Sequence, residues 1–314
     1  MKIHRWLLLS IIVPVLWGLW GALIEIPEKW VNPTFPSTLG YVLWSLTMLL
    51  VASFALRNVH WKIDSNLRSV GYGCAVGFTG AAGQLLLFWG LMRGPAYIIF
   101  PIICLSPVVT IVLSATLLHE RTHLVAGIGI VLSLLAIFFL SLQEPGNSPV
   151  HGNGWLAISI SIFFMWGLQA YFMKSSANFI SPEGLFFYMA VTALLLCPLA
   201  LLLTDFSAPI NWGLSGAYLS GSLQLLNSFG ALLLIYAIRW GKAIIVVPMI
   251  NGLFPVVTIV LSLFIYHRVP TTYNFIGLFL AIIAIFLMAF NEVKHSAPAA
   301  DALIAQHREH IPLR

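Results

Sequence analysis

The string PVVTIVLS occurs twice in this chain, at residues 107–114 and again at residues 255–262. The same offset relates His119 to His267 and further identical residues on either side. These are Gly129 with Gly277, Ala136-Ile-Phe138 with Ala284-Ile-Phe286, and, at nearly the same spacing, Trp17-Gly-Leu19 with Trp166-Gly-Leu168. An identical string inside a longer matching stretch indicates an internal repeat, in which the second half of the chain copies the first.

The composition places this repeat in a membrane. Apolar residues make up 60% of the 314 residues, charged residues only 8%, and the mean hydropathy is +0.96. A soluble domain carries about 25% charged residues, so this chain has too few charges for a water-facing surface. The net charge of +5 does not indicate nucleic-acid binding, because the basic residues are spread between apolar runs.

Apolar runs of about 20 residues, the length that crosses a bilayer as a helix, recur along the whole chain. Ten such spans are predicted, with ends good to a few residues: 6–26, 37–56, 69–92, 97–118, 124–142, 154–173, 184–204, 213–238, 243–265 and 273–291. With the N-terminus in the cytoplasm, 12 of the 15 Lys and Arg residues fall on the inner side and three, Lys29, Arg93 and Arg268, on the outer side. This bias predicts that both termini are cytoplasmic.

Each repeat holds five spans, an odd number, so the second copy must enter the membrane from the opposite side. The expected fold is therefore an all-α membrane protein of ten transmembrane helices in two inverted five-helix repeats. The first repeat is predicted over residues 1–143 and the second over 144–291, followed by a disordered cytoplasmic tail over 292–314.

Several function classes lack their motifs. No nucleotide-binding Gly-x-x-x-x-Gly-Lys loop and no His-Glu-x-x-His zinc motif is present. Cys74, Cys104 and Cys197 have irregular spacing within apolar runs, which favours neither a disulfide framework nor a metal site. Gly213-Leu-Ser-Gly216 is similar to the serine motif of rhomboid proteases, but no later span carries a histidine in its interior to serve as the base. We expect no enzyme activity, no catalytic residue, no metal and no cofactor.

The chain resembles the EamA-like branch of the drug/metabolite transporter superfamily. The resemblance covers nearly the whole chain: Trp-Gly early in each half, a proline-bearing fourth helix, Glu120 nine residues before Gly129, and Lys174 eight residues after Trp166. It implies a central cavity between the halves and the transport of small organic solutes, often metabolite export. In this sequence Glu25 takes the place of the lysine in the first half, and Arg268 stands where the second half usually has the glutamate.

Glu25, near the outer end of the first span, shares a helical face with Gly18 and Gly21. It is either a proton site or partner for a cationic substrate, or an interfacial carboxylate beside Lys29. Glu120, at the inner turn between the fourth and fifth spans, is expected to cap a helix or form an ion pair.

Polar residues inside the third and eighth spans are candidates for the cavity wall. Gln84 shares a face with a row of glycines, and Gln224 and Asn227 are neighbours on one side of the eighth span. These amides either bind a polar substrate or bond to adjacent helices.

The remaining candidates are aromatic residues, polar residues and prolines within spans. Substrate contact is predicted for Trp17, Trp20, Trp166, Gln169, Tyr188 and Asn251, although aromatic residues in apolar helices often serve packing alone. Helix kinks that serve gating are predicted at Pro101, Pro107, Pro248 and Pro255, with static kinks as the alternative.

Together these features predict a secondary transporter that moves a metabolite, an amino acid or a drug-like compound by alternating access, with proton-coupled export as one form. A sugar or nucleoside uptake carrier of the same fold, an intramembrane enzyme and a channel are the alternatives. The expected partners are a small-molecule substrate and the lipid bilayer, without nucleic acid; a homodimer is compatible with this and not required. The expected location is the cell membrane, as a multi-pass protein of the bacterial inner membrane.

Overall fold

The computed structural model describes residues 4–309 apart from residues 92, 94–95, 143–153 and 268–269, and every regular element in these ranges is helical. The first half contains α1 (Arg5–Leu23), the π-helical turn η1 (Ile26–Trp30), α2 (Ser37–Asn58), α3 (Leu67–Leu91), α4 (Ala96–Cys104), α5 (Pro107–Thr116) and α6 (Leu124–Ser141). The second half contains α7 (Gly154–Ser176), α8 (Pro182–Leu195), α9 (Cys197–Leu202), the π-helical turn η2 (Leu214–Tyr218), α10 (Leu219–Trp240), α11 (Ala243–Tyr266) and α12 (Thr272–Glu309). The predicted boundary at residues 143 and 144, and Arg268, lie outside the described residues.

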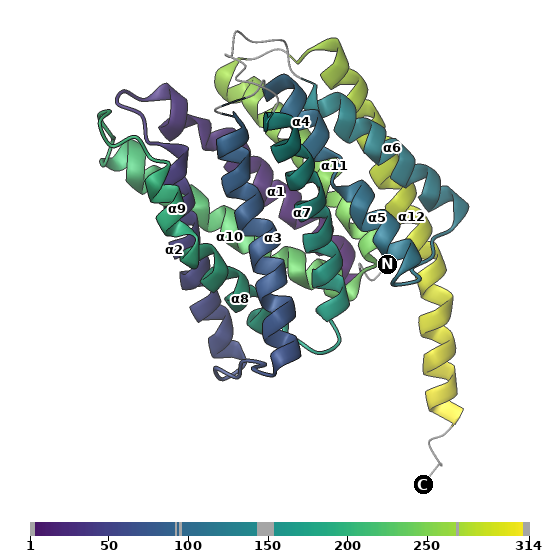
Figure 1. The fold of residues 1–314 in the computed structure, drawn as a ribbon. Helices are drawn as coiled ribbons and strands as arrows, with labels where there is room; N and C mark the ends of the chain where they lie inside the picture. Colours follow the sequence, from purple (N-terminus) through teal and green to yellow (C-terminus); the bar gives the residue numbers. More distant parts are fainter. Residues whose placement is uncertain (1–3, 92, 94–95, 143–153, 268–269, 310–314) are drawn as a thin grey trace.

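Nine helical segments in the described ranges are long and apolar enough to cross a membrane. They match nine of the ten predicted spans; the exception is the run predicted over 97–118, which the structure divides into α4 and α5. Pro107 is the first residue of α5 and has no backbone N–H to continue the hydrogen bonding of α4. The same string lies inside α11, which runs without a break through Pro248 and Pro255. Residues 292–309 form a helical continuation of α12, which extends beyond the bundle (Figure 1).

Contacts between the two halves dominate the packing of the bundle. In the first half, α1 packs against α10 and α11, and α2 against α8, α9 and α10. In the second half, α7 packs against α3, α4 and α5, and α12 packs against α6 (Figure 1). The halves interlock in this way, so neither half has a separate core.

The contacts that the two halves make are reciprocal. On Gly129 of α6, a Cβ atom would lie 2.8 Å from Met288 Cγ of α12, and on Gly277 of α12 it would lie 2.6 Å from Leu140 Cγ of α6. The repeat offset that relates Gly129 to Gly277 also relates Leu140 to Met288. Small residues let these helix backbones approach closely, which is how helices associate in lipid. Residues that are equivalent in the sequence repeat therefore make equivalent contacts between α6 and α12.

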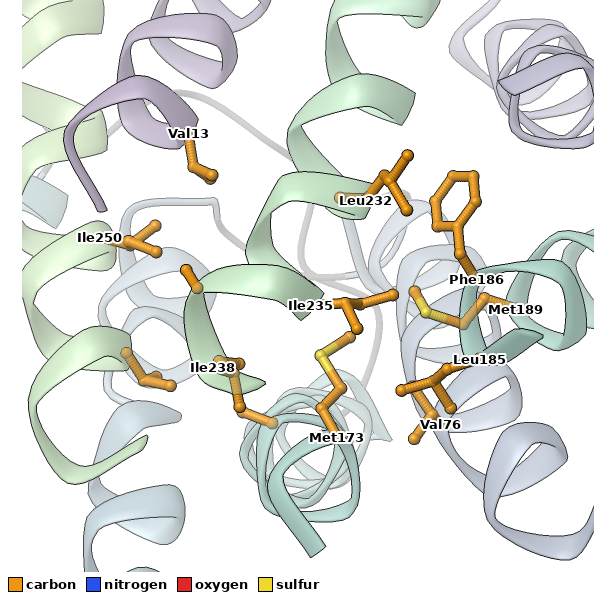
Figure 2. Close-up of a cluster of buried hydrophobic side chains, with 14 of the residues drawn as sticks. Val13, Val76, Met173, Leu185, Phe186, Met189, Leu232, Ile235, Ile238 and Ile250 are labelled. Atoms are coloured by element: carbon orange, nitrogen blue, oxygen red, sulfur yellow. The ribbon is translucent and has the colours of Figure 1, made fainter. Parts of the chain in front are cut away.

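The centre of the bundle is filled with apolar side chains from both halves. Figure 2 shows side chains of α1, α3, α7, α8, α10 and α11 converging, each at most 8% exposed: Val13, Val76, Met173, Leu185, Phe186, Met189, Leu232, Ile235, Ile238 and Ile250. Many of them lie toward the starts of α3, α8 and α11 and the end of α10. This core joins side chains from both halves of the chain.

Candidate functional site

At one end of the bundle Glu120, which lies between α5 and α6, contacts helices of the second half, and we refer to this end as the Glu120 end. The Glu120 carboxylate accepts hydrogen bonds from the backbone N–H groups of Ala243 (3.1 Å) and Ile244 (2.9 Å) at the start of α11. Lys174 Nζ lies 3.5 Å from Glu120 Oε1 and donates to the Gly241 carbonyl at the end of α10. The carboxylate thus meets the positive end of one helix dipole and the ammonium meets the negative end of another. The prediction that Glu120 caps a helix or forms an ion pair is confirmed.

A second group of polar contacts closes the same end. Asp64, between α2 and α3, accepts hydrogen bonds from Ser181 N (2.8 Å) and Ser181 Oγ (2.9 Å) at the start of α8. The hydroxyl of Tyr188 donates to the Asp64 carbonyl over 2.8 Å. Tyr188 was a predicted cavity residue; the structure places it at the Glu120 end, with its ring packed on Gly73 of α3.

A row of glycines on α3 receives side chains of the second half. Cβ atoms built on these glycines would overlap the following partners: Gly73 with Tyr188, Gly77 with Thr192, Gly80 with Gln169, and Gly83 with Trp166. The indole N–H of Trp166 also donates to the Gly80 carbonyl, at 3.4 Å. The predicted cavity residues Trp166 and Gln169 are therefore packed tightly against α3 in this structure.

The matching row on α10 is built from larger, polar side chains. Gly230 corresponds to Gly83, because it packs against Trp17 as Gly83 packs against Trp166. Counting back along α10 at the spacing of the α3 row gives Asn227, Gln224 and Ser220, in place of three glycines. These three side chains lie where α10 contacts α1 and α2. The two halves thus pack in the same way at these rows, but the row on α10 carries polar side chains where the row on α3 has glycines.

Trp17 joins α1 to this row. Its indole N–H donates to the Asn227 carbonyl over 3.2 Å, and its ring meets Phe254 of α11 edge-on at 6.4 Å. The side-chain amide of Asn227 donates in turn to Gln224 Oε1 at 3.4 Å. The predicted candidates Trp17, Gln224 and Asn227 are therefore brought together by the fold.

Three polar atoms surround a position beside Gly40 of α2 that has room for a group of the size of a methyl. A Cβ atom built on Gly40 would lie 3.5 Å from Glu28 Oε1, 3.6 Å from Gln224 Nε2 and 3.7 Å from Ser220 Oγ. Ser220 is 0% and Gln224 4% exposed. We refer to Glu28, Gly40, Ser220 and Gln224 as the Gly40 notch, and to the end of the bundle that holds Glu28 as the Glu28 end.

Three buried hydrogen-bond donors on α1, α2 and α10 have no partner among the described residues. Trp20 Nε1, Trp44 Nε1 and Ser220 Oγ are buried, and none of them has a hydrogen-bond partner in the described part of the chain. Trp20 follows Trp17 by about one turn of α1, and Trp44 follows Gly40 by about one turn of α2. Buried polar groups in proteins are nearly always hydrogen-bonded. Ser114, Thr122 and Trp155 also carry unsatisfied donors elsewhere in the bundle, so such a donor indicates a binding position only beside other polar groups, as Ser220 Oγ does in the notch.

The other predicted candidates lie outside this group. Glu25 is at the Glu28 end, 3.7 Å from Lys29 Nζ. Asn251 donates to the Val247 carbonyl of its own helix at 2.9 Å, and Gln84 is half-buried on α3 with no hydrogen bond to any described residue. Pro101 lies within α4, and its side chain is outside the described part.

Sequence reasoning did not identify Glu28, Gly40, Trp44 or Ser220 as site residues. The signal was present in the repeat, because the offset of the PVVTIVLS strings relates Gly40 to Tyr188 and Trp44 to Thr192. Tyr188 fills the space beside Gly73 in one half, so its glycine counterpart leaves the matching space in the other half open.

A separate groove lies between α3 and α9. It has a volume of about 350 Å³ and is lined only by apolar side chains: Leu85, Leu86, Trp89, Leu199, Leu202 and Leu203. None of the predicted candidates lines it. Within the described residues, no group of His, Cys, Asp and Glu could hold a metal ion, and the three cysteines are free.

Known proteins similar to this chain point to one family. A model of the EamA-like transporter family matches residues 4–142 and again residues 153–290. An uncharacterized protein of Methanocaldococcus jannaschii is 28% identical over 139 residues, which are 44% of this chain and 97% of that protein. One crystal structure has a TM-score of 0.73 at 15% identity and covers 90% of this chain and 95% of its own, which shows the fold alone. The resemblance seen in the sequence is confirmed: the chain belongs to the EamA-like transporter family, part of the drug/metabolite transporter superfamily.

Proposed function

We propose that this protein is a secondary transporter that carries a small organic solute across the cell membrane by alternating access. The observation that carries the proposal is the Gly40 notch, where Glu28 Oε1, Gln224 Nε2 and the unsatisfied Ser220 hydroxyl meet between apolar helices. Polar and ionisable groups within membrane-spanning helices are costly and mark substrate or ion pathways. A solute that exchanges hydrogen bonds with these groups would supply the partners that the protein does not.

The proposed topology has ten spans, with α4 and α5 together forming the fourth, and both termini in the cytoplasm. Two contacts support an inverted arrangement of the halves. Glu120, in the turn before α6, contacts the Ala243 end of α11, whereas Tyr266, before the turn to α12, stacks on Trp30 at the opposite end. These contacts support repeat-equivalent turns at opposite ends of the bundle, and the distribution of Lys and Arg supports a cytoplasmic Glu120 end.

The difference between the two rows suggests how access alternates. At the α3 row, Gly73, Gly77, Gly80 and Gly83 hold α7 and α8 close, which closes the path toward the cytoplasm. Opening toward the cytoplasm requires α7 and α8 to move away from these glycines, and the Glu120–Lys174 pair to separate. Rocking of one repeat against the other around a fixed site is how inverted-repeat carriers work.

The solute site in this proposal is formed by Trp20, Gln224 and Asn227 together with the Gly40 notch, and Trp17 supports it by packing on Gly230. Trp166, Gln169 and Tyr188 would contact solute only after the α3 row opens, since each is packed on a glycine here. Pro107, Pro248 and Pro255 are proposed to let α5 and α11 bend during the change.

Flux measurements with purified protein in proteoliposomes test the carrier function. A panel of amines, neutral solutes and organic acids is offered with and without a proton gradient. A carrier gives saturable flux that unlabelled solute on the far side accelerates. Flux that does not saturate and is not accelerated would identify a channel and reject the proposal. A proton role for Glu25 predicts that Glu25→Gln abolishes the pH dependence of flux, and retained pH-driven flux rejects that role.

A further inference from the structure

Glu28 differs from the other acidic side chains that the structure describes. Each of the others has a partner: Glu25 pairs with Lys29, Glu120 with Lys174, Glu183 accepts from Tyr236, Asp64 from Ser181 and Asp205 from Ser207. Glu28 forms no ion pair and accepts no hydrogen bond from any described residue. Its nearest charged neighbours, Glu25 and Lys29, are paired with each other at 3.7 Å. A carboxylate is thus left facing the notch without a donor.

Gly40 differs from most of the glycines at helix contacts, and from Gly221 in having only polar atoms around it. Cβ atoms on Gly73, Gly83, Gly129 and similar residues would overlap a neighbour, so packing requires those glycines. Beside Gly40, in contrast, the nearest atom would be 3.5 Å away, an ordinary contact distance, and the three nearest atoms are all polar. Close helix packing therefore does not require a glycine here, and the glycine leaves room at a position that Glu28 Oε1 faces.

We infer that the Gly40 notch binds the protonated amine of the transported solute, with Glu28 as its charge partner. This inference rests on the proposed carrier function and names the class of solute. An ammonium donates charge-assisted hydrogen bonds to a carboxylate at about 2.8 Å, and the Ser220 hydroxyl is a second acceptor for it. Gln224 Nε2 is itself a donor and would face an oxygen of the same solute. A neutral or anionic solute would offer the Glu28 carboxylate no charge-assisted hydrogen bond.

The surrounding residues fit an amine with a short organic body. Trp20 lies about one turn from Trp17 on α1, and Trp44 lies about one turn from Gly40 on α2. Indole rings attract cations by their π-face. Their unsatisfied N–H groups and the Ser220 hydroxyl are free to donate to an oxygen of the same solute.

Binding in detergent micelles by calorimetry tests the charge preference with matched probes. These are phenethylammonium, 2-phenylethanol and 3-phenylpropionate, and the smaller set propylammonium, propan-1-ol and butyrate. We expect an ammonium to bind at least about tenfold more tightly than the alcohol and the acid of its set. Equal affinity for the matched alcohol, or binding of neither ammonium, would overturn the inference.

Two variants locate the amine in the notch. Glu28→Gln keeps the shape of the side chain and removes its charge, and should weaken ammonium binding at least about tenfold. Gly40→Ala fits the fold and fills the open position, so it should weaken ammonium binding about fivefold or more while the melting temperature is unchanged. Ammonium affinity within about twofold of wild type in Glu28→Gln would contradict the assignment.

Asp205→Asn is the matched control, because Asp205 is an exposed carboxylate outside the spans. Hydrogen bonds from Ser207 lower the pKa of Asp205, so it is charged at neutral pH. The control should bind like wild type.

Flux of the same probes in proteoliposomes separates this inference from the carrier function. If a neutral or acidic probe shows saturable flux and no ammonium does, the protein is a carrier but the amine site is wrong. Ammonium binding that Glu28→Gln removes, without saturable flux of any probe, would support the site and reject the carrier.

Discussion

Glu120 and Lys174 lie 3.5 Å apart at the point where α11 begins, and they belong to different halves of the chain. Glu120 also accepts two backbone hydrogen bonds from α11, so one carboxylate joins the turn after α5, the end of α7 and the start of α11. The side chain of Glu120 is 9% exposed and that of Lys174 22%. A pair this shielded holds its end of the bundle closed more firmly than an exposed surface pair would.

Removing this carboxylate should destabilise the protein. Glu120→Ala deletes two hydrogen bonds to a charged acceptor and leaves Lys174 without its counter-charge, so we expect a loss of about 2–3 kcal/mol. Thermal unfolding in detergent measures it. Arg121→Ala is the control: the Arg121 side chain is exposed and only its backbone carbonyl is used, by Lys242, so its effect should stay within about 0.5 kcal/mol. Equal stabilities of the two variants would contradict the proposed role of Glu120.

Two glycines of α6 provide a test of the contact between the repeats. Gly129→Ala would place its Cβ 2.8 Å from Met288 Cγ and 3.0 Å from the Ala284 carbonyl, and should destabilise the protein by about 1–3 kcal/mol. Gly127, two residues earlier, has no atom within 4 Å of its Cβ position. Gly127→Ala should therefore stabilise the helix by about 0.5–1 kcal/mol. Melting temperatures that shift in the same direction for both variants would show that α6 does not face α12 through Gly129.

Truncation of the α10 amides should impair transport and leave the fold intact. Gln224→Ala and Asn227→Ala each remove hydrogen bonds offered to solute, and we expect the ratio of maximal flux to half-saturating concentration to fall about fivefold to tenfold. Ser222→Ala, on the same helix, removes only an exposed bond to the Tyr218 carbonyl and serves as the control. Flux in both amide variants equal to that of the control would exclude these amides from the site.

Tyr188 should influence which end of the bundle is open. Tyr188→Phe loses the hydrogen bond to the Asp64 carbonyl but keeps the ring on Gly73. A hydrogen bond of this kind contributes about 1 kcal/mol, so the closed Glu120 end should become roughly fivefold less favoured. The readout is the labelling rate of Ser69→Cys, a 0% exposed position at the start of α3, from the membrane face at the Glu120 end, relative to the same cysteine with Tyr188 intact. An unchanged rate would show that the bond to Asp64 does not hold this end closed.

The sequence predicted the features that depend on composition and on the repeat. Nine spans, the pairing of Trp17 with Trp166, and the proximity of Gln224 and Asn227 could be read from apolar runs and helical spacing. The break at Pro107 could not, because the same eight residues form an unbroken helix around Pro255. Whether the helix breaks at this proline therefore depends on the neighbouring helices rather than on the eight residues themselves.

The Gly40 notch could not be found from one helix at a time. Glu28 reaches it from the turn after α1, Gly40 from α2, and Ser220 and Gln224 from α10, so it exists only through the register between three elements. The sequence singled out Glu25 as the functional carboxylate, whereas the structure pairs Glu25 with Lys29 and leaves Glu28 facing the notch. The sequence does not show how deep each of these two carboxylates lies in the bundle, and that depth decides which of them faces the notch.

Alternating access is tested most directly by measuring whether the α10 row can be reached from both faces of the membrane. In a background without Cys74, Cys104 and Cys197, Asn227→Cys is treated with a membrane-impermeant thiol reagent in vesicles of each orientation, and Ser220→Cys provides a second position. Alternating access predicts labelling from both faces of the membrane, faster from the face at the Glu28 end. Labelling from one face alone at saturating reagent, for both positions, would contradict alternating access.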